Sequence, residues 1–206
     1  MDKAVSPPQV RKIAEADFPT RFGHFRIFGF EGDYESGTEE AVVLKTGDLR
    51  EEPPPLVRIH SECLTGDVFH SLRCDCRAQL ELSLERIAGE KRGLLIYEHK
   101  EGRGIGLMNK LRAYALQDQG ADTVEANLQL GFDVDLRDYK LPADILLHFG
   151  ITRVRLLSNN PQKIQALQEA GIEVVERIPC QVPPVETSEF YLRTKKEKLG
   201  HLLEGY

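Results

Sequence analysis

GLLIYEHKEGRGIGLMNKLRAYALQ, residues 93–117, contains the pattern that decides the fold class. Its first six residues, 93–98, form a short apolar run that is typical of a buried strand. Three glycines then break the run, and apolar residues return at helical spacing through Leu107, Leu111 and Ala115. A strand that enters a helix through a glycine-rich turn indicates a domain in which helices and strands alternate.

The segments upstream of this unit are mainly β. Stretches rich in β-branched and aromatic residues, separated by Gly, Asp and Pro clusters, predict strands at 24–30, 41–46 and 55–60. Leucine and isoleucine residues that share one face predict a helix at 77–90. Residues 1–20 carry three prolines among charged side chains, and we expect them to be a flexible lead-in.

Downstream of the unit, helices and strands alternate. Asn160 is a candidate N-cap, Pro161 stands at the first helical position, and Gly171 ends that helix. The sequence therefore predicts a mixed α/β (α+β) fold, a single domain over residues 21–206 with a mainly β N-terminal part. The remaining predicted elements are helices at 122–130 and 141–149, strands at 154–158 and 172–178, and a basic helical tail at 188–204.

The composition limits the classes of function. Of the 206 residues, 41% are hydrophobic and 29% are charged, as in ordinary globular proteins. The formal net charge of -6 argues against binding to bulk nucleic acid, because phosphate neutralisation needs a basic face, but it permits a nucleotide in a locally positive cleft. No apolar run of about 18 residues or secretory signal is present, so we expect no membrane contact, a cytoplasmic protein and reduced cysteines.

Three cysteines form a candidate metal site. Ten residues separate Cys63 from Cys74, and one residue separates Cys74 from Cys76. Thiolates select zinc over hard cations, and three protein ligands leave a coordination position for water, as in catalytic zinc sites. Since three thiolates make the metal a weak acid, we expect a general base nearby, and Glu62 and Asp135 are candidates.

The spacing leaves other kinds of cysteine site open. His60 or His70 could complete a closed, structural zinc site. Inert buried thiols are the simplest alternative, but the C-x-C unit flanked by Arg73 and Asp75 argues against them.

Further polar groups are ambiguous when each is considered alone. The glycine-rich turn at 101–106 resembles an anion-binding strand-to-helix turn, and Arg103 favours phosphate, yet many such turns only change the chain direction. Tyr114 is as well explained by core packing. The acidic stretch 132–140 is equally consistent with a solvated loop, and residues 153–163 with a surface edge and a capped helix.

Taken in order, three segments resemble the GTP cyclohydrolase II family. The resemblance extends from about residue 20 to the tail, and the order of the motifs is highly specific. The segments are RIHSECLTGDVFHSLRCDC (58–76), HKEGRGIGLMNKLRAYALQDQGADTVEANLQLGFDVDLRDY (99–139) and LLSNNPQKIQALQEAGIEVVER (156–177).

The resemblance implies an enzyme and a set of site residues. It implies hydrolysis of GTP to 2,5-diamino-6-(5-phospho-D-ribosylamino)pyrimidin-4(3H)-one with release of formate and pyrophosphate, the first step of riboflavin biosynthesis. It also implies one Zn²⁺ per subunit, Mg²⁺ with the triphosphate, and a homodimer. The implied zinc ligands are Cys63, Cys74 and Cys76, and the implied GTP-binding residues are Arg58, Ile59, His60, Ser61, Glu62, Gln79, Glu101, Gly102, Arg103, Thr123, Ser158 and Lys163.

Three more residues receive catalytic roles from the resemblance. Asp135 is the implied general base, Arg137 the implied nucleophile toward the α-phosphate, and Tyr114 takes part in ring opening. Because an arginine side chain is essentially always protonated, an electrostatic role for Arg137 is the alternative. The chain departs from the family pattern at Ser158, where threonine is usual, and at Arg77, where a small residue is usual.

Two alternative functions stay open at this point. A related enzyme could stop at the formamido intermediate, although retention of Tyr114 favours release of formate. A non-catalytic nucleotide-binding or zinc-stabilised interaction module would need neither Tyr114 nor the pair Asp135 and Arg137.

Overall fold

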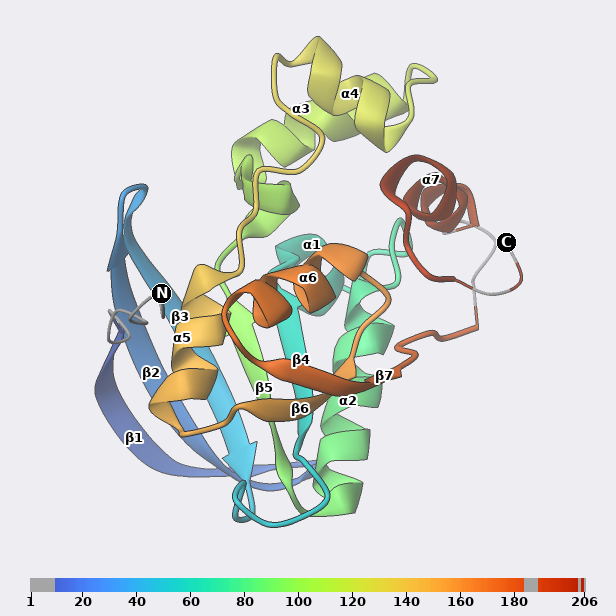
Figure 1. Cartoon of the computed structure of the whole chain (residues 1–206). Helices are drawn as coiled ribbons and strands as arrows, with labels where there is room; N and C mark the ends of the chain where they lie inside the picture. The colour runs from blue at the N-terminus through green and yellow to red at the C-terminus, as the bar shows by residue number, and fades with distance from the viewer. Residues whose placement is uncertain (1–9, 184–188, 204, 206) are drawn as a thin grey trace.

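The strands of the computed structural model, which describes residues 10–183, 189–203 and 205, form one seven-stranded sheet (Figure 1). The sheet order is β1-β2-β3-β5-β4-β6-β7, antiparallel from β1 through β5 and parallel from β5 through β7. The strands are β1 (Val10–Thr20), β2 (Gly23–Tyr34), β3 (Gly37–Thr46), β4 (Leu56–Ser61), β5 (Gly93–Glu98), β6 (Arg153–Leu157) and β7 (Glu173–Ile178).

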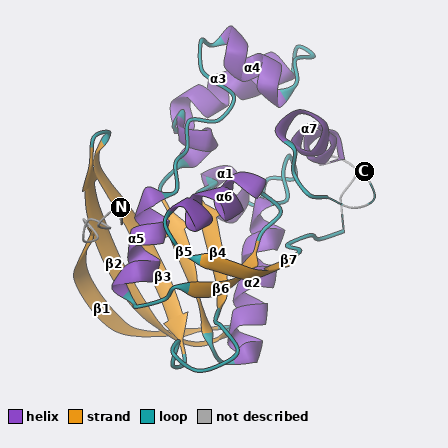
Figure 2. Cartoon of the chain, viewed as in Figure 1, coloured by secondary structure: helices purple, strands orange, loops and turns teal. Residues whose placement is uncertain are grey.

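Helices cover both faces of the sheet and extend beyond one end of it (Figure 2). None of the helices in the described ranges has the length and apolar character needed to cross a membrane. They are α1 (Leu64–Asp67), α2 (Cys76–Glu90), the 3₁₀ turn η1 (Glu101–Gly104), α3 (Leu107–Gln117), α4 (Thr123–Gln129), α5 (Lys140–His148), α6 (Pro161–Glu169) and α7 (Glu189–Leu199).

Side-chain alternation along the strands builds a core on each face. In β5, Leu94 and Ile96 join the larger core beneath α5 and α6, while Leu95 joins the smaller core beneath α2. All three side chains are almost completely buried, which explains why β5 is a continuous apolar run. The middle of the sheet is therefore held rigidly, and residues at the ends of its strands inherit fixed positions.

The predicted mixed α/β fold with a β-rich first part is confirmed, as is the capped helix α6. The Asn160 side chain accepts a hydrogen bond of 2.9 Å from the Gln162 N–H, and Pro161 is the first helical residue. For residues 10–20 the predicted flexible lead-in was wrong, because Val10–Thr20 pairs with β2 as an edge strand. Prolines are tolerated on edge strands, so Pro19 was a poor indicator of irregular structure.

The parallel strands end together at the edge that carries the polar segments. Ser61 ends β4, Glu98 ends β5 and Leu157 ends β6, and the loops that follow lead to α1, η1 and α6. Figure 1 shows α3 and α4 standing beyond this edge as a separate upper layer. Ligand sites of parallel sheets are typically found at such carboxyl ends.

Candidate active site and metal centre

A cavity of about 500 Å³ lies at the carboxyl ends of the parallel strands. Its walls come from the loops after β4 and β5, from α3 and α4, from the β6–α6 turn and from the C-terminal segment. Nearly all the predicted site residues line it: Arg58, His60, Ser61, Glu62, Cys63, Cys74, Cys76, Gln79, Glu101, Gly102, Arg103, Tyr114, Thr123, Arg137, Ser158 and Lys163.

Two predicted residues lie just behind the cavity wall. The Ile59 side chain is buried in the larger core, and its carbonyl oxygen accepts a hydrogen bond of 2.8 Å from Lys163 Nζ. Asp135 contacts Arg137, which does line the cavity. Both residues therefore position a neighbour that faces the cavity.

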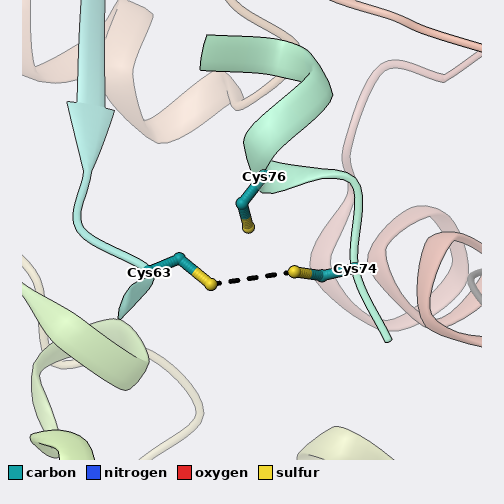
Figure 3. Close-up of side chains that lie close together, drawn as sticks. All are labelled: Cys63, Cys74 and Cys76. Carbon is teal, nitrogen blue, oxygen red and sulfur yellow. Dashed lines mark hydrogen bonds between the residues drawn. The ribbon is translucent and has the colours of Figure 1, made fainter. Parts of the chain in front are cut away.

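The three predicted cysteine ligands converge on one point (Figure 3). Cys63 follows β4 and Cys76 begins α2, and the three sulfur atoms lie within 4.8 Å of one another. The Cys63 and Cys74 sulfurs are 3.7 Å apart, close to the roughly 3.8 Å expected for two sulfurs of a tetrahedral zinc site with Zn–S bonds of about 2.3 Å. This spacing fits a zinc ion.

Gly66 provides the space beside these sulfurs. A Cβ atom at this position would lie 2.9 Å from Cys74 Sγ and 3.2 Å from Cys63 Sγ. Real Cβ atoms essentially never approach another heavy atom within 3.0 Å, so only glycine fits here without displacing a ligand. The helix α1 thus packs its bare backbone against the metal centre.

No histidine joins the cysteines in the part of the chain that the structure describes. The only group of potential ligands found there is Cys63, Cys74 and Cys76. His60 is fully buried and its Nε2 faces Asp67 at 3.1 Å, while burial lowers the pKa of His60 despite the neighbouring carboxylate. These described residues favour the open, three-sulfur centre over the closed alternative.

Asp67 connects the metal loop to the sheet. Its Oδ2 accepts hydrogen bonds from the Cys63 N–H at 3.0 Å and the Tyr97 hydroxyl at 2.9 Å, and it also contacts His60. The carboxylate is buried, and charge-assisted hydrogen bonds of this kind are strong. The backbone of Cys63 is therefore fixed by groups from β4 and β5.

The thiols share their protons unevenly. Hydrogen bonds from Cys74 and Cys76 lower the pKa of Cys63, and Lys110, whose Nζ lies 3.1 Å from Cys63 Sγ, lowers it further. Hydrogen bonding to Cys63 raises the pKa of Cys74 to about 11 and also raises that of Cys76. Because cysteine binds metal as thiolate, binding of a metal to this cluster would release the protons that its thiols still carry.

Arg137 is held by a carboxylate and a hydroxyl. Its Nε and Nη2 donate to the two oxygens of Asp135 at 2.8 and 2.6 Å, and its Nη1 donates to Ser61 Oγ at 3.1 Å. Ser61 in turn donates to Glu98 at 2.5 Å. Burial lowers the pKa of Arg137, but the hydrogen bonds that it donates to Asp135 and the charges of nearby acidic groups outweigh this effect and leave the pKa above its ordinary value.

Burial acts in the opposite direction on Asp135. Burial raises the pKa of Asp135, yet the hydrogen bonds and charge of Arg137 outweigh that effect and leave the pKa below its ordinary value. Asp135 and Arg137 therefore form a charged, bidentate pair with a fixed geometry.

Two other cations face the cavity without a full set of carboxylate partners. Both Nη atoms of Arg103 are buried and have no hydrogen-bond partner among the described residues. Lys163 is fully buried, and desolvation together with Arg58 lowers its pKa to about 7. An unpaired buried guanidinium is costly, and a bound anion would satisfy it.

The backbone at Arg103 is also unusual. Gly102 and Arg103 both have φ of 61°, a left-handed conformation that non-glycine residues rarely adopt. Strain of this kind is found most often at functional sites.

Tyr114 lines the cavity beside the metal centre. Its hydroxyl is 3.1 Å from Thr65 Oγ1, which is itself 3.7 Å from Cys63 Sγ. The guanidinium of Arg73 lies 4.8 Å from the Tyr114 ring centre, within cation–π range. The hydroxyl therefore faces the metal loop, and Tyr114 is not a simple core residue.

Known sequences match this chain over nearly its whole length. The family model described as GTP cyclohydrolase II matches residues 11–179. The proteins called GTP cyclohydrolase-2 from Shigella boydii serotype 18 and from Escherichia coli are each 55% identical over 95% of this chain and 98% of their own length. The chain belongs to the GTP cyclohydrolase II family.

A solved structure shows the same fold at lower similarity. The two-domain 3,4-dihydroxy-2-butanone 4-phosphate synthase from A. baumannii aligns with a TM-score of 0.50 and 18% sequence identity. The match covers 84% of this chain but only 41% of that protein, so this member of the GTP cyclohydrolase II family spans about two fifths of its length. At this identity the match supports the fold alone.

The two departures from the GTP cyclohydrolase II pattern lie at different distances from the cavity. Ser158 lines it, and the hydroxyl oxygen accepts a hydrogen bond of 3.1 Å from the Asn160 N–H. Arg77 is not among the cavity-lining residues, and it donates to Glu81 at 2.7 Å and to the Asp67 carbonyl oxygen at 2.5 Å. Its added charge is therefore used to hold the end of α1.

Several polar residues of the site were not predicted from the sequence. Lys110 bridges Cys63 to the Glu101 carboxylate, and Glu98 lies behind Ser61. The sequence signal for Glu98 was a charged residue at the end of a buried strand. Lys195 and His201 also line the cavity, and no motif pointed to them.

Proposed function

We propose that this chain is a zinc-dependent GTP cyclohydrolase II of the cytoplasm. It hydrolyses GTP to 2,5-diamino-6-(5-phospho-D-ribosylamino)pyrimidin-4(3H)-one, formate and pyrophosphate, as the first step of riboflavin biosynthesis. The observation that supports this most directly is that one cavity of about 500 Å³ contains both a three-cysteine metal centre and the unpaired Arg103. Its size lies within the usual range for small-molecule sites.

The cofactors follow from the chemistry of the ligands. Cys63, Cys74 and Cys76 would hold one Zn²⁺ through three soft thiolates. When bound, the zinc supplies Lewis-acid activation of water for hydrolysis of the purine ring at C8 and of the resulting formyl group. Mg²⁺ would accompany the triphosphate, because metal ions that bridge phosphate oxygens neutralise the charge that develops during phosphoryl transfer.

The basic side chains would bind and orient the triphosphate. Arg103 and Lys163 project into the cavity from the η1 turn and from α6, and both suit phosphate oxygens. The segment Arg58 to Glu62, with Gln79, Glu101, Gly102, Thr123 and Ser158, completes the proposed GTP site. Contacts from several elements would fix the position of the purine relative to the metal centre.

Arg137 and Asp135 would act at the α-phosphate. The family resemblance implies that Asp135 is a base and Arg137 a nucleophile. The charged pair of Asp135 and Arg137 supports different roles for the two residues. Arg137 would stay protonated and stabilise negative charge on the α-phosphate as pyrophosphate leaves. Asp135 would then orient the guanidinium.

Tyr114 would assist ring opening from its place beside the metal loop. Its hydroxyl can hold or donate a proton near the group that leaves the ring, because it lies next to Thr65 and the Cys63 loop. Retention of this tyrosine supports full release of formate over a stop at the formamido intermediate.

Turnover tests the proposal. The protein would be incubated with GTP, Mg²⁺ and Zn²⁺, and formate and product mass measured, with the variant Cys74→Ser as the metal-site control. Equal amounts of formate and of the diaminopyrimidine are expected from the native chain and none from the variant. A product that retains the formyl group would identify the shortened reaction, and absence of turnover would favour a binding module. Light scattering would test the proposed homodimer.

A further inference from the structure

The C-terminal segment, residues 189–203, forms one wall of the cavity. It consists of α7 and the residues that follow, and α7 packs beside α4 at the end of the molecule that holds the cavity (Figure 1). Leu192 and Leu203 are buried, so both ends of the segment are anchored. Lys195 and His201 are among the residues that line the cavity.

Polar contacts tie this segment to three other walls. Lys195 Nζ lies 3.0 Å from Asp75, the residue between Cys74 and Cys76. Lys198 pairs with Asp122, the N-cap of α4. The Leu202 N–H donates to the Asn159 carbonyl oxygen in the β6–α6 turn at 2.9 Å. The segment therefore contacts the metal loop, α4 and the α6 turn together.

The charges around His201 suit a polyanion. The groups that act on its ring are cations: Lys195, Arg103, Arg137 and Lys163. Burial and these cations lower the pKa of His201, so its imidazole is neutral and keeps one N–H donor. No hydrogen bond to its ring is recorded from any residue that the structure describes.

The nearby carboxylates, which include Glu98 beside Lys163, do not pair with every cation of this cluster. Asp75 pairs with Lys195 and Asp135 pairs with Arg137, which leaves the buried Arg103 nitrogens without a partner in the described ranges. Buried cations require a counter-charge, and a polyphosphate chain carries several acceptor oxygens that could reach all sides of the cavity.

We propose that Lys195 and His201 bind the triphosphate of the nucleotide, opposite Arg103 and Lys163, so that the C-terminal segment completes the phosphate-binding half of the site. This inference rests on the proposed function, since it takes a purine nucleoside triphosphate as the ligand. It adds residues that the family match does not cover, because the matched region ends at residue 179.

Equilibrium binding to the full chain separates a phosphate contact from a structural role. The variants are His201→Ala, His201→Gln and Lys195→Met, with Arg193→Met as the control, since Arg193 is an exposed cation on the same helix. The probes are a GTP analogue with a methylene bridge between the α- and β-phosphorus atoms, and guanosine. Zinc content and melting temperature are measured for every variant.

His201→Ala and Lys195→Met should each weaken binding of the triphosphate analogue by about tenfold, a typical loss for one hydrogen bond to a charged group. Guanosine affinity, zinc content and the Arg193→Met control should stay at the native values. His201→Gln should retain more affinity than His201→Ala, because an amide N–H can still donate.

Two results would overturn the inference. One is triphosphate affinity within twofold of native in both His201→Ala and Lys195→Met. The other is an equal loss for guanosine and the analogue, which would mean that the segment only shapes the cavity. Formate release by the native chain is tested separately, so a failure of the proposed function cannot be mistaken for a failure of this inference.

Discussion

Replacing Gly66 with alanine should damage the metal centre while leaving the fold intact. In α1 the substitution favours the helix by about 1 kcal/mol, because alanine has the higher helix propensity. The new Cβ, however, would lie 2.9 Å from Cys74 Sγ, whereas ordinary contacts begin at 3.4 Å. The Cys74 sulfur and the α1 backbone must therefore move apart, by about 0.5 Å if the contact is to reach the ordinary 3.4 Å.

A displacement of that size exceeds what a zinc site accepts. Ligand distances in well-formed sites vary by only about 0.2 Å, and weaker changes around a metal reduce affinity by about 10- to 100-fold. We expect zinc affinity to fall at least about tenfold, or about 1.4 kcal/mol, with formate release falling in parallel. Competition with a chromogenic chelator measures the affinity, and calorimetry measures the melting temperature.

Gly89 provides the matched control. It lies in α2, and nothing lies within 4 Å of the position that a Cβ would occupy. Gly89→Ala should therefore stabilise the protein by about 1 kcal/mol and leave zinc affinity unchanged. Zinc affinity within twofold of native in Gly66→Ala would refute the steric reasoning, and unfolding of that variant would show that Gly66 is needed for more than the metal.

Three further perturbations test other parts of the site. Arg137→Ala should abolish turnover and leave the zinc content unchanged, because none of the hydrogen bonds of Arg137 goes to a cysteine. Loss of zinc from this variant, measured by atomic absorption, would contradict the proposed role of Arg137 at the α-phosphate. Lys110→Met should lower kcat about 10- to 100-fold, because it removes the cation between Cys63 and Glu101. Lys110→Arg should retain most of the activity, and an equal loss of activity in both variants would argue against a role for the charge. Burial lowers the pKa of Lys163 to about 7, so the ammonium is present below that pH and lost above it. The ratio kcat/KM for GTP should therefore fall as pH rises through about 7, and Lys163→Arg should remove that fall, while an unchanged profile would show that another group titrates.

The core elements were predictable because their physics is local. β5 is apolar on both faces because helices cover both, and α6 has both its cap and its proline in sequence. β1 was missed for the opposite reason. Its residues are mostly exposed, and four of the eleven are charged. Only its pairing with β2 over its whole length makes it a strand. Such an edge strand carries no apolar pattern of its own.

The metal centre was predictable for a related reason. Its three cysteines lie within 14 residues, and their chemistry is evident from the residue type. Lys110, Glu98 and His201 could not be predicted as site residues from the sequence. Each belongs to the site only through groups that lie far away along the chain. The sequence also did not indicate that Asp135 lies behind the cavity wall, because its position depends on the conformation of the Arg137 side chain to which it is hydrogen-bonded.

The anchoring of Cys63 by Asp67 bears on the order of assembly. Many small zinc modules are unfolded until the ion arrives, because the ion supplies their folding energy. Here the sheet holds the ligand loop through a buried carboxylate whose donors come from His60, Tyr97 and the Cys63 backbone. The metal-free protein should accordingly be folded and able to bind zinc. A chelator should therefore abolish activity reversibly without unfolding the protein.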